Sequence, residues 1–353
     1  MRKTIHTLFF ALLFAALAAV AFTPAGVAAP KGQPLSLGED GFRPERANWL
    51  ASVRTIQLSD NFFCFYTGRD GKMGYPMLSP DDDNWGQFDL WLGIASYALV
   101  NGKEAVIFDT LLLPEYSAQV RSRLEAFGVE KFTVINTHMD MDHTGGNEVY
   151  KDSTIIASKG ANDALNARFA EIEAGTLWGP PATNPLILPN QLIAEDTELT
   201  LAGFKIQLFV IDAHEDGGVM CAYIPALKAL IVGDLAEDNV VLLNVPGDIK
   251  RYIAETQRLL DMDLDYDYVF PGHAAPDRIA RGEYNKRFIE SALVYQQRLL
   301  EWVDKPDYLK LEMKDFLGEF FADGTLEFYE PYVYVHQSNA EAVHKLFSKN
   351  AKP

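Results

Sequence analysis

The chain has 353 residues, of which 48% are hydrophobic and 23% charged, and it contains 25 Gly, 18 Pro and only 2 Cys. This composition excludes disordered, collagen-like and disulfide-dense proteins, and the length suits one large or two average domains. The 31 Lys and Arg residues against 49 Asp and Glu give a net charge of −18. This charge argues against nucleic acid or an anionic membrane surface as a partner and is compatible with cationic metals.

The first 29 residues are predicted to be separate from the fold. Arg2 and Lys3 precede an apolar run over residues 8–22, and small residues follow up to Ala29. This order is typical of a secretory signal peptide, and the run is shorter than the ~20 residues that a transmembrane helix needs. We therefore expect residues 1–29 to be cleaved, and the mature protein to be exported, periplasmic or secreted, and free of the membrane.

Predicted strands follow, beginning with one over residues 55–68. Apolar runs at 94–100 and 104–110 are joined by Asn101-Gly102, which is a strong signal for a β-hairpin. Cys64 and Cys221 both lie in apolar, strand-like contexts, where a buried thiol is the simpler interpretation. An oxidising compartment would also permit a disulfide between them, and the sequence leaves this open.

Two long irregular segments are predicted, at residues 69–91 and 177–190. The first contains Asp81 to Asp83, and we favour solvated surface for it over the rim of a pocket. Each segment contains a tryptophan, Trp85 in the first and Trp178 in the second, that either lines a pocket or attaches its segment to the core.

The remaining predicted elements alternate along the chain. They are a helix over 114–127, strands at 132–137 and 154–158, a helix over 162–173, strands at 197–201, 205–212, 219–224 and 229–233, a helix over 248–261 and a strand at 268–270. Helices dominate from residue 283 onward. The alternation predicts an α/β sandwich of layers with a helical C-terminal extension covering it.

A dense cluster of candidate metal ligands lies at residues 136–146, where a buried strand meets a helix start. Four side chains able to bind a metal fall within six positions: His138, Asp140, Asp142 and His143. A turn after a strand can direct such side chains at one point, and Gly145 and Gly146 let the backbone tighten beside them. We expect Met139 and Met141 to point away.

Three later segments also place a candidate ligand directly after an apolar strand. These ligands are His214, Asp234 and His273. Since strand ends meet at one edge of an α/β sheet, we expect them to line the same crevice. Asp212, two residues before His214, either supports the ligands or only ends its strand.

These residues resemble the metallo-β-lactamase superfamily of metal-dependent hydrolases. The usual motif of that family, H-x-H-x-D-H, is followed by a separate His, an Asp and a final His. The resemblance spans roughly residues 55–277 and implies a four-layer αβ/βα sandwich. We accordingly divide the mature chain into a metallo-β-lactamase-like domain over 30–282 and a helical extension over 283–353.

The resemblance also implies two divalent metal ions. Their ligands would be His138, Asp140 and His214 for the first ion and Asp142, His143 and His273 for the second, with Asp234 bridging them. Asp109, in a strand ahead of the motif, would support the catalytic site from behind the ligands. Asp142 could orient the nucleophile as well as bind metal.

The chain departs from the usual motif at Asp140, which replaces the second His. With three ionised Asp ligands, two divalent cations and one hydroxide, the formal charge of the site would be 0 instead of +1. A less positive site favours harder metals than a histidine-rich one. Zinc is the first expectation, and iron and manganese also suit the ligands.

We expect metal-assisted hydrolysis of a small molecule. A metal-bound hydroxide would attack an ester, lactone, thioester or amide-type bond. Two alternatives stay open. One is a di-iron oxygen-reducing or oxygenase enzyme, because carboxylate-rich relatives on the same fold bind iron, and the other is a non-enzymatic metal-binding protein.

Overall fold

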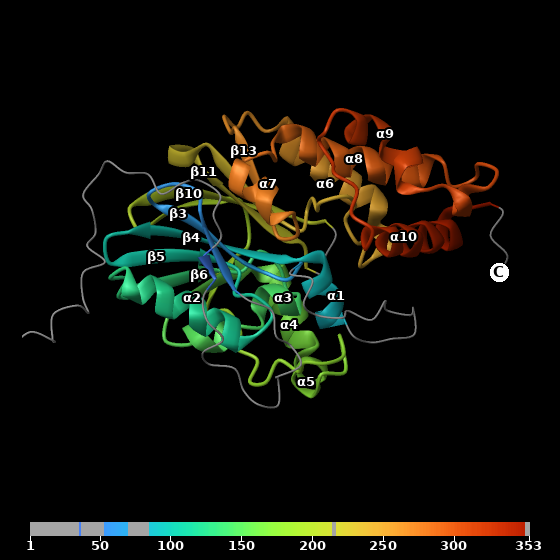
Figure 1. Ribbon diagram of the computed structural model, residues 1–353. Helices are drawn as coiled ribbons and strands as arrows, with labels where there is room; N and C mark the ends of the chain where they lie inside the picture. Colours follow the sequence, from blue (N-terminus) through green and yellow to red (C-terminus); the bar gives the residue numbers. More distant parts are fainter. Residues whose placement is uncertain (1–34, 37–52, 70–84, 214–216, 350–353) are drawn as a thin grey trace, which may run out of the picture. The chain divides into compact units, whose positions relative to one another are not determined.

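The computed structural model describes residues 35–36, 53–69, 85–213 and 217–349 (Figure 1). The chain divides into two units, Met1–Pro30 and Lys31–Pro353, and the first lies wholly outside the described residues. The predicted signal peptide, the acidic run Asp81 to Asp83 and His214 therefore also lie outside them. Among the residues described, no helix is both long enough and apolar enough to span a bilayer.

The larger sheet has eight strands within the described residues, and they lie side by side in sequence order. The strands are β1 (Leu35–Ser36), β2 (Arg54–Gln57), β3 (Phe62–Thr67), β4 (Ile94–Asn101), β5 (Glu104–Phe108), β6 (Lys131–Ile135), β7 (Thr154–Ser158) and β8 (Gln191–Ile193). Neighbours are antiparallel from β1 to β5 and parallel from β5 to β8. The parallel half therefore brings the carboxyl ends of β5, β6 and β7 to one edge.

The first predicted strand, over residues 55–68, is wrong in one respect. The chain turns between β2 and β3, where the amides of Leu58 and Ser59 both donate to the carbonyl oxygen of Phe62, at 2.9 and 3.0 Å. The Ser-Asp-Asn sequence that precedes Phe62 is a turn signal within an otherwise strand-like run. The predicted hairpin is confirmed, with Asn101 of β4 opposite Glu104 of β5.

The smaller sheet has five strands in the described part of the chain, in the order β13-β12-β11-β10-β9. The strands are β9 (Thr197–Leu201), β10 (Phe204–Ile211), β11 (Val219–Ile224), β12 (Ala229–Gly233) and β13 (Tyr268–Pro271). Only β12 and β13 pair in parallel, so their carboxyl ends also lie together.

The two sheets share one hydrophobic core. Fully buried side chains of the larger sheet, such as Phe108, belong to the same cluster as Ile206 and Ile231 of the smaller sheet. Cys64 and Cys221 are in this cluster as free, buried thiols, and burial raises the pKa of both. The buried-thiol interpretation therefore holds, and the structure contains no disulfide between them.

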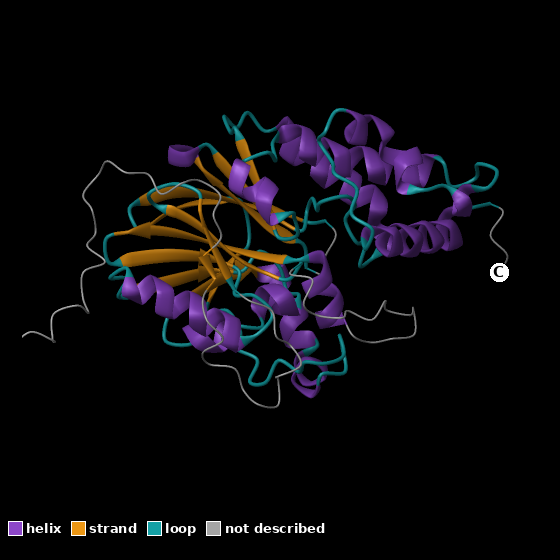
Figure 2. Ribbon diagram, in the orientation of Figure 1, coloured by secondary structure: helices purple, strands orange, loops and turns teal. Residues whose placement is uncertain are grey.

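Helices of the described residues lie around both sheets (Figure 2). They are α1 (Trp85–Leu92), α2 (Pro114–Ala126), α3 (Met141–Thr144), α4 (Lys159–Ala167), α5 (Phe169–Ala174), α6 (Ile249–Asp261), α7 (Pro276–Arg281), α8 (Lys286–Glu301), α9 (Met313–Ala322) and α10 (Tyr332–Phe347), with short 3₁₀ turns η2 (Asn147–Tyr150), η3 (Pro225–Leu227), η4 (Pro246–Asp248) and η5 (Tyr308–Lys310). Helix α2 packs on the larger sheet, whereas α6 and α8 contact β10 and β13 of the smaller one. The predicted α/β sandwich with C-terminal helices is confirmed.

Two helical predictions need correction. The predicted helix over 162–173 is two helices, α4 and α5, separated at Arg168. The predicted loop over residues 69–91 ends in α1, whose side chains Phe88, Leu90 and Leu92 are almost fully buried. Tertiary packing stabilises such a short helix, which local propensity does not predict.

The C-terminal helices continue the core. Tyr295 and Leu299 of α8 are buried in the same cluster as the sheets, and α8 contacts α6, α9 and α10. The division of the mature chain at residue 282 stays a prediction.

Candidate metal centre

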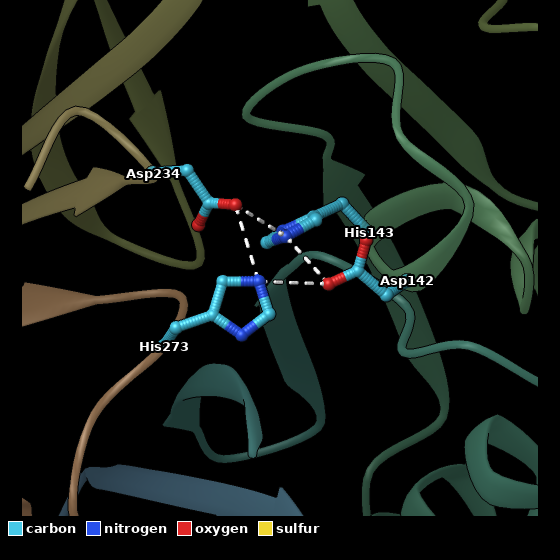
Figure 3. A group of neighbouring side chains, drawn as sticks. All are labelled: Asp142, His143, Asp234 and His273. Carbon is cyan, nitrogen blue, oxygen red and sulfur yellow. Dashed lines mark ion pairs between the residues drawn. The ribbon is translucent and has the colours of Figure 1, made fainter. Parts of the chain in front are cut away.

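The candidate ligands come from strand ends in both sheets. The segment after β6 carries Asp142 and His143, Asp234 follows β12, and His273 follows β13. One ligand atom of each of these four buried side chains lies within 4.8 Å of the others (Figure 3). They are the predicted ligands of the second ion together with the predicted bridge.

The contacts within the cluster are close and converge on carboxylate oxygens. His143 Nε2 lies 3.1 Å from Asp142 Oδ2 and 3.3 Å from Asp234 Oδ2. His273 Nε2 lies 3.1 and 3.2 Å from the same two oxygens. His138 Nε2 is 3.5 Å from Asp234 Oδ2, so Asp234 faces three imidazoles.

Each of these imidazoles is held through its other nitrogen. His143 Nδ1 pairs with Asp109 Oδ2 at 2.9 Å, and His273 Nδ1 with the carbonyl oxygen of Gly93 at 2.8 Å. His138 Nδ1 is 2.9 Å from Thr137 Oγ1. Since a carbonyl and a carboxylate only accept hydrogen bonds, these contacts place a proton on Nδ1 and leave Nε2 free to bind a cation.

Asp109 connects two of these contacts. Its carboxylate accepts hydrogen bonds from the backbone amide of Thr137 at 2.7 Å and from the Thr137 hydroxyl at 2.8 Å, besides its contact with His143. Because the hydroxyl of Thr137 donates to Asp109, its oxygen is left to accept from His138 Nδ1. The carboxylate thus orients one imidazole directly and a second through Thr137.

The donor set fits a metal ion. His138 Nε2, Asp142 Oδ2, His143 Nε2 and Asp234 Oδ1 are buried and have no hydrogen-bond partner among the residues that the structure describes. Buried polar atoms without a partner are costly, and imidazole nitrogens with carboxylate oxygens are the ligands that zinc and related divalent cations use. The residues present would therefore hold such an ion.

Opposite charges compensate within the cluster. Burial alone would lower the pKa of His143, but the carboxylates of Asp142 and Asp234 raise it well above its usual value. Burial alone would also lower the pKa of His273, but the carboxylates of Asp234 and Asp142 raise it well above its usual value. In turn, the imidazoles lower the pKa of Asp142 and of Asp234, although burial opposes this. A bound cation would take the place of these protons, since ligation requires neutral imidazole.

A cavity of about 330 Å³ opens onto the cluster, with Asp142, Asp234 and His273 among its lining residues. Trp85 of α1 and Trp178 also line it, and the Trp85 amide donates to the Trp178 carbonyl oxygen at 3.2 Å. Both tryptophans pack against hydrophobic clusters as well. The two interpretations of these residues therefore hold together: each lines the cavity and attaches its segment to the core.

The expectation that Met139 and Met141 point away from the site is wrong in part. Both are buried in hydrophobic clusters, yet both also line the cavity. Helix α3 begins at Met141, so from that residue on the side chains follow a helical and not an extended spacing.

The predicted ligands of the first ion are only partly brought together. His138 lies against Asp234, and His214 is outside the described residues. Asp140 lines the cavity, and its Oδ2 accepts a hydrogen bond from Asn244 Nδ2 at 3.2 Å, but it is not one of the four clustered residues. Asp212, directly after β10, lies at the surface with its Oδ2 2.5 Å from Arg251 Nη1, and whether it also supports His214 stays a prediction because His214 is outside the described residues.

Two acidic residues in the cavity were not identified from the sequence. Burial raises the pKa of Asp89 in α1 well above its usual value, and the nearby Asp142 raises it further. Burial and Asp234 raise the pKa of Glu237 to about 8. Glu237 lies three residues after the candidate ligand Asp234, and this proximity is a weak indication that it belongs to the site. Nothing in the predicted loop over residues 69–91 distinguished Asp89 as a cavity residue.

Comparison with known proteins agrees with this geometry. A family model described as the metallo-beta-lactamase superfamily matches residues 90–273, about half of the chain. The chain belongs to this superfamily. Membership supports a metal-dependent hydrolase at the level of the superfamily, and the buried Asp and His cluster is consistent with divalent metal binding.

A solved structure of the superfamily has the same fold, and two others are similar with lower TM-scores. A metallo-beta-lactamase from Pontibacter korlensis is 16% identical, with a TM-score of 0.51 over 69% of this chain and 99% of its own. VMB-1 is 19% identical and DIM-1 metallo-beta-lactamase 17%, each with a TM-score of 0.48 over 68% of this chain and 97% of its own. Comparison with curated proteins gives no match. At these identities the likeness shows the fold alone.

Proposed function

We propose that this superfamily member is an exported hydrolase that uses divalent metal ions, zinc in the first place, to cleave an ester, lactone, thioester or amide-type bond of a small molecule. The observation that carries the proposal is the position of the cluster in the wall of the cavity, with buried ligand atoms that have no hydrogen-bond partner in the described part of the chain. Export is supported by the order of charged, apolar and small residues over positions 1–29.

The residues divide into two sets around Asp234. Asp142, His143 and His273 would hold one ion, and Asp234 would be shared with a second ion at His138. Asp140 and His214 would complete the second set. Bound cations would supply Lewis acidity and would lower the pKa of a coordinated water.

The remaining residues prepare the site for this chemistry. Asp109 and the Gly93 carbonyl keep the imidazoles in the tautomer that ligation requires. The Asp142 carboxylate lies in the cavity wall, where it can accept a hydrogen bond from the attacking water and orient it. Trp85, Phe88 and Trp178 exclude water from the cavity and offer apolar walls to the acyl part of a substrate.

The proposal is tested by reloading chelator-treated protein with Zn²⁺, Mn²⁺ or Fe²⁺ and assaying a chromogenic ester, a lactone, a thioester and a β-lactam. We expect turnover of at least one class with Zn²⁺, lost with EDTA and regained with metal. Asp234→Asn should reduce it more than about 100-fold, because even the partners of metal ligands contribute 10- to 100-fold. Asp265→Asn, on the surface and paired with Lys228, is the matched control and should keep wild-type turnover.

Turnover that survives EDTA or Asp234→Asn would contradict the proposal. Oxygen consumption by the iron-loaded protein without hydrolysis would point to the di-iron alternative. Stoichiometric metal without any turnover across the panel would point to a non-enzymatic metal-binding protein.

A further inference from the structure

Part of the cavity wall is formed by the segment between β12 and η4, residues 234–245, which contains no helix or strand. Glu237, Leu242, Asn244 and Val245 of this segment line the cavity. Within the segment, the Leu242 amide donates to Glu237 Oε1 at 3.2 Å. No strand partner holds it, so its position depends on contacts from elsewhere in the fold.

The C-terminal helices provide such contacts through the amide of Asn339 in α10. Asn339 Nδ2 donates to the Val241 carbonyl oxygen at 2.7 Å, and Asn339 Oδ1 accepts from the Leu243 amide at 3.0 Å. Asn339, Val241 and Leu243 are all almost completely buried. One side chain thus satisfies both backbone groups on either side of Leu242, much as a neighbouring strand would.

A second asparagine, Asn239, makes the same type of contact, but here the side chain belongs to the wall segment and the backbone groups belong to the C-terminal region. Asn239 Nδ2 donates to the Glu327 carbonyl oxygen at 2.7 Å, and Asn239 Oδ1 accepts from the Tyr329 amide at 2.8 Å. Asn239 is buried and has a positive φ of 131°, a backbone conformation that most residues avoid. The wall segment is therefore hydrogen-bonded to the C-terminal region at Asn239 as well as at Val241 and Leu243.

The wall also reaches the metal centre. Asn244, one residue beyond Leu243, donates to Asp140 Oδ2 at 3.2 Å. Hydrogen-bond partners of a ligating carboxylate fix its orientation and affect metal affinity. The position of residues 241–243 therefore determines whether Asn244 meets Asp140.

We propose that Asn339 is a positioning residue of the metal centre: by holding residues 241–243 it fixes the cavity wall and keeps the Asn244 amide on Asp140. The C-terminal helices are then part of the site and not only a cover over the sandwich. The effect on turnover rests on the proposed hydrolase function, whereas the effect on metal affinity rests only on the ligand role proposed there for Asp140.

The test compares Zn²⁺ affinity, measured by competition with a chromophoric chelator, across a small set of variants. Asn339→Asp keeps the acceptor for Leu243 but removes the donor to Val241, and Asn339→Ser weakens both contacts. Asn244→Ala, at an exposed position, removes the contact with Asp140 directly. The control is Tyr308→Phe, which removes a buried hydrogen bond to the Leu299 carbonyl oxygen elsewhere in the C-terminal helices.

We expect Asn244→Ala to weaken Zn²⁺ binding about 10-fold. The Asn339 variants should also weaken Zn²⁺ binding, and Tyr308→Phe should leave the Zn²⁺ affinity unchanged. In the Asn244→Ala background, Asn339→Asp should have no further effect, because both act on the same contact. For a bulky ester, Asn339→Asp should raise KM several-fold with little change in kcat.

Unchanged Zn²⁺ affinity in a folded Asn339 variant, or additive effects of the two substitutions, would overturn the proposal. Should neither Asn339 variant fold, unchanged affinity in Asn244→Ala would overturn it and weakened affinity would support it. If the wild-type protein binds Zn²⁺ but hydrolyses no substrate, the proposed function is wrong, and the affinities still decide this inference.

Discussion

Asp109 shows how one buried carboxylate can set the geometry of two histidines. It directly follows β5 with a positive φ of 63°, a conformation that Asp tolerates better than most residues, and from there its two oxygens reach both Thr137 and His143. Such a residue contributes by fixing direction. Because the imidazoles are already oriented, they have less rotational freedom to lose when a metal binds, and this favours metal binding.

Glu237 makes the stability of the metal-free protein depend on pH. Its pKa is raised by burial and by Asp234 from 4.5 to about 8, so the folded state binds its proton more tightly than the unfolded state. This contribution to the free energy of unfolding is complete below about pH 4.5 and is lost as the pH rises through 8. Glu237→Gln, which imitates the neutral acid, should therefore be more stable than wild type at pH 8.5.

The gain in the free energy of unfolding of Glu237→Gln at pH 8.5 should be a few kcal/mol at most, since one pKa unit corresponds to about 1.4 kcal/mol. Thermal unfolding in EDTA at pH 5.5 and pH 8.5 measures it, with Glu301→Gln at an exposed position of α8 as the control. A Tm difference between Glu237→Gln and wild type that is the same at both pH values would contradict the assignment.

At the level of single residues, the sequence identified the candidate ligands that the structure brings together, but not their neighbours in the cavity. His138, Asp142 and His143 share one motif after a strand, and their chemistry is visible from spacing alone. Asp89 and Asn244 reach the cavity only through the packing of α1 and of the wall segment, which no local pattern encodes. Residues that act through tertiary packing are therefore the ones that sequence reasoning missed.

At the level of elements, the ends of β12 and β13 approach too closely for any side chain but hydrogen at Gly272. A Cβ there would lie 2.2 Å from Asp234 Oδ1 and 2.7 Å from His143 Cε1. Gly272→Ala must displace one of these candidate ligands, and we expect Zn²⁺ affinity to fall at least about 10-fold, comparable with the loss of a ligand's partner.

The matched control is Gly247→Ala in η4, where an added Cβ meets nothing within 4 Å. Isothermal titration with Zn²⁺ compares the two variants with wild type. Equal affinity in Gly272→Ala and Gly247→Ala would show that the close approach has no bearing on metal binding.

Elements with a clear period or a turn signal were predicted closely, as with α2, α6 and the hairpin of β4 and β5. Helix α1 was missed because its aromatic residues gain their stability from the core and not from helix propensity. The break between β2 and β3 was missed because an unbroken apolar run outweighed a short turn signal.

At the level of the whole molecule, the candidate centre exists only where the two sheets meet. Asp142 and His143 follow a strand of the larger sheet, whereas Asp234 and His273 follow strands of the smaller one. The sequence predicted an α/β sandwich, but which strand belongs to which sheet depends on long-range pairing that a single sequence does not reveal. The resemblance to a family supplied the four-layer arrangement, but it assigned no individual strand to a sheet.

Anomalous X-ray diffraction at the zinc edge, from crystals of the zinc-loaded protein, tests most directly whether these strand ends gather around metal. We predict a peak about 2.0–2.2 Å from Nε2 of His143 and His273 and from the carboxylates of Asp142 and Asp234. A second peak should lie near His138, ~3.5–4 Å from the first. Imidazoles turned away from one another, or zinc bound only elsewhere on the acidic surface, would contradict the metal centre and the hydrolase proposed on it.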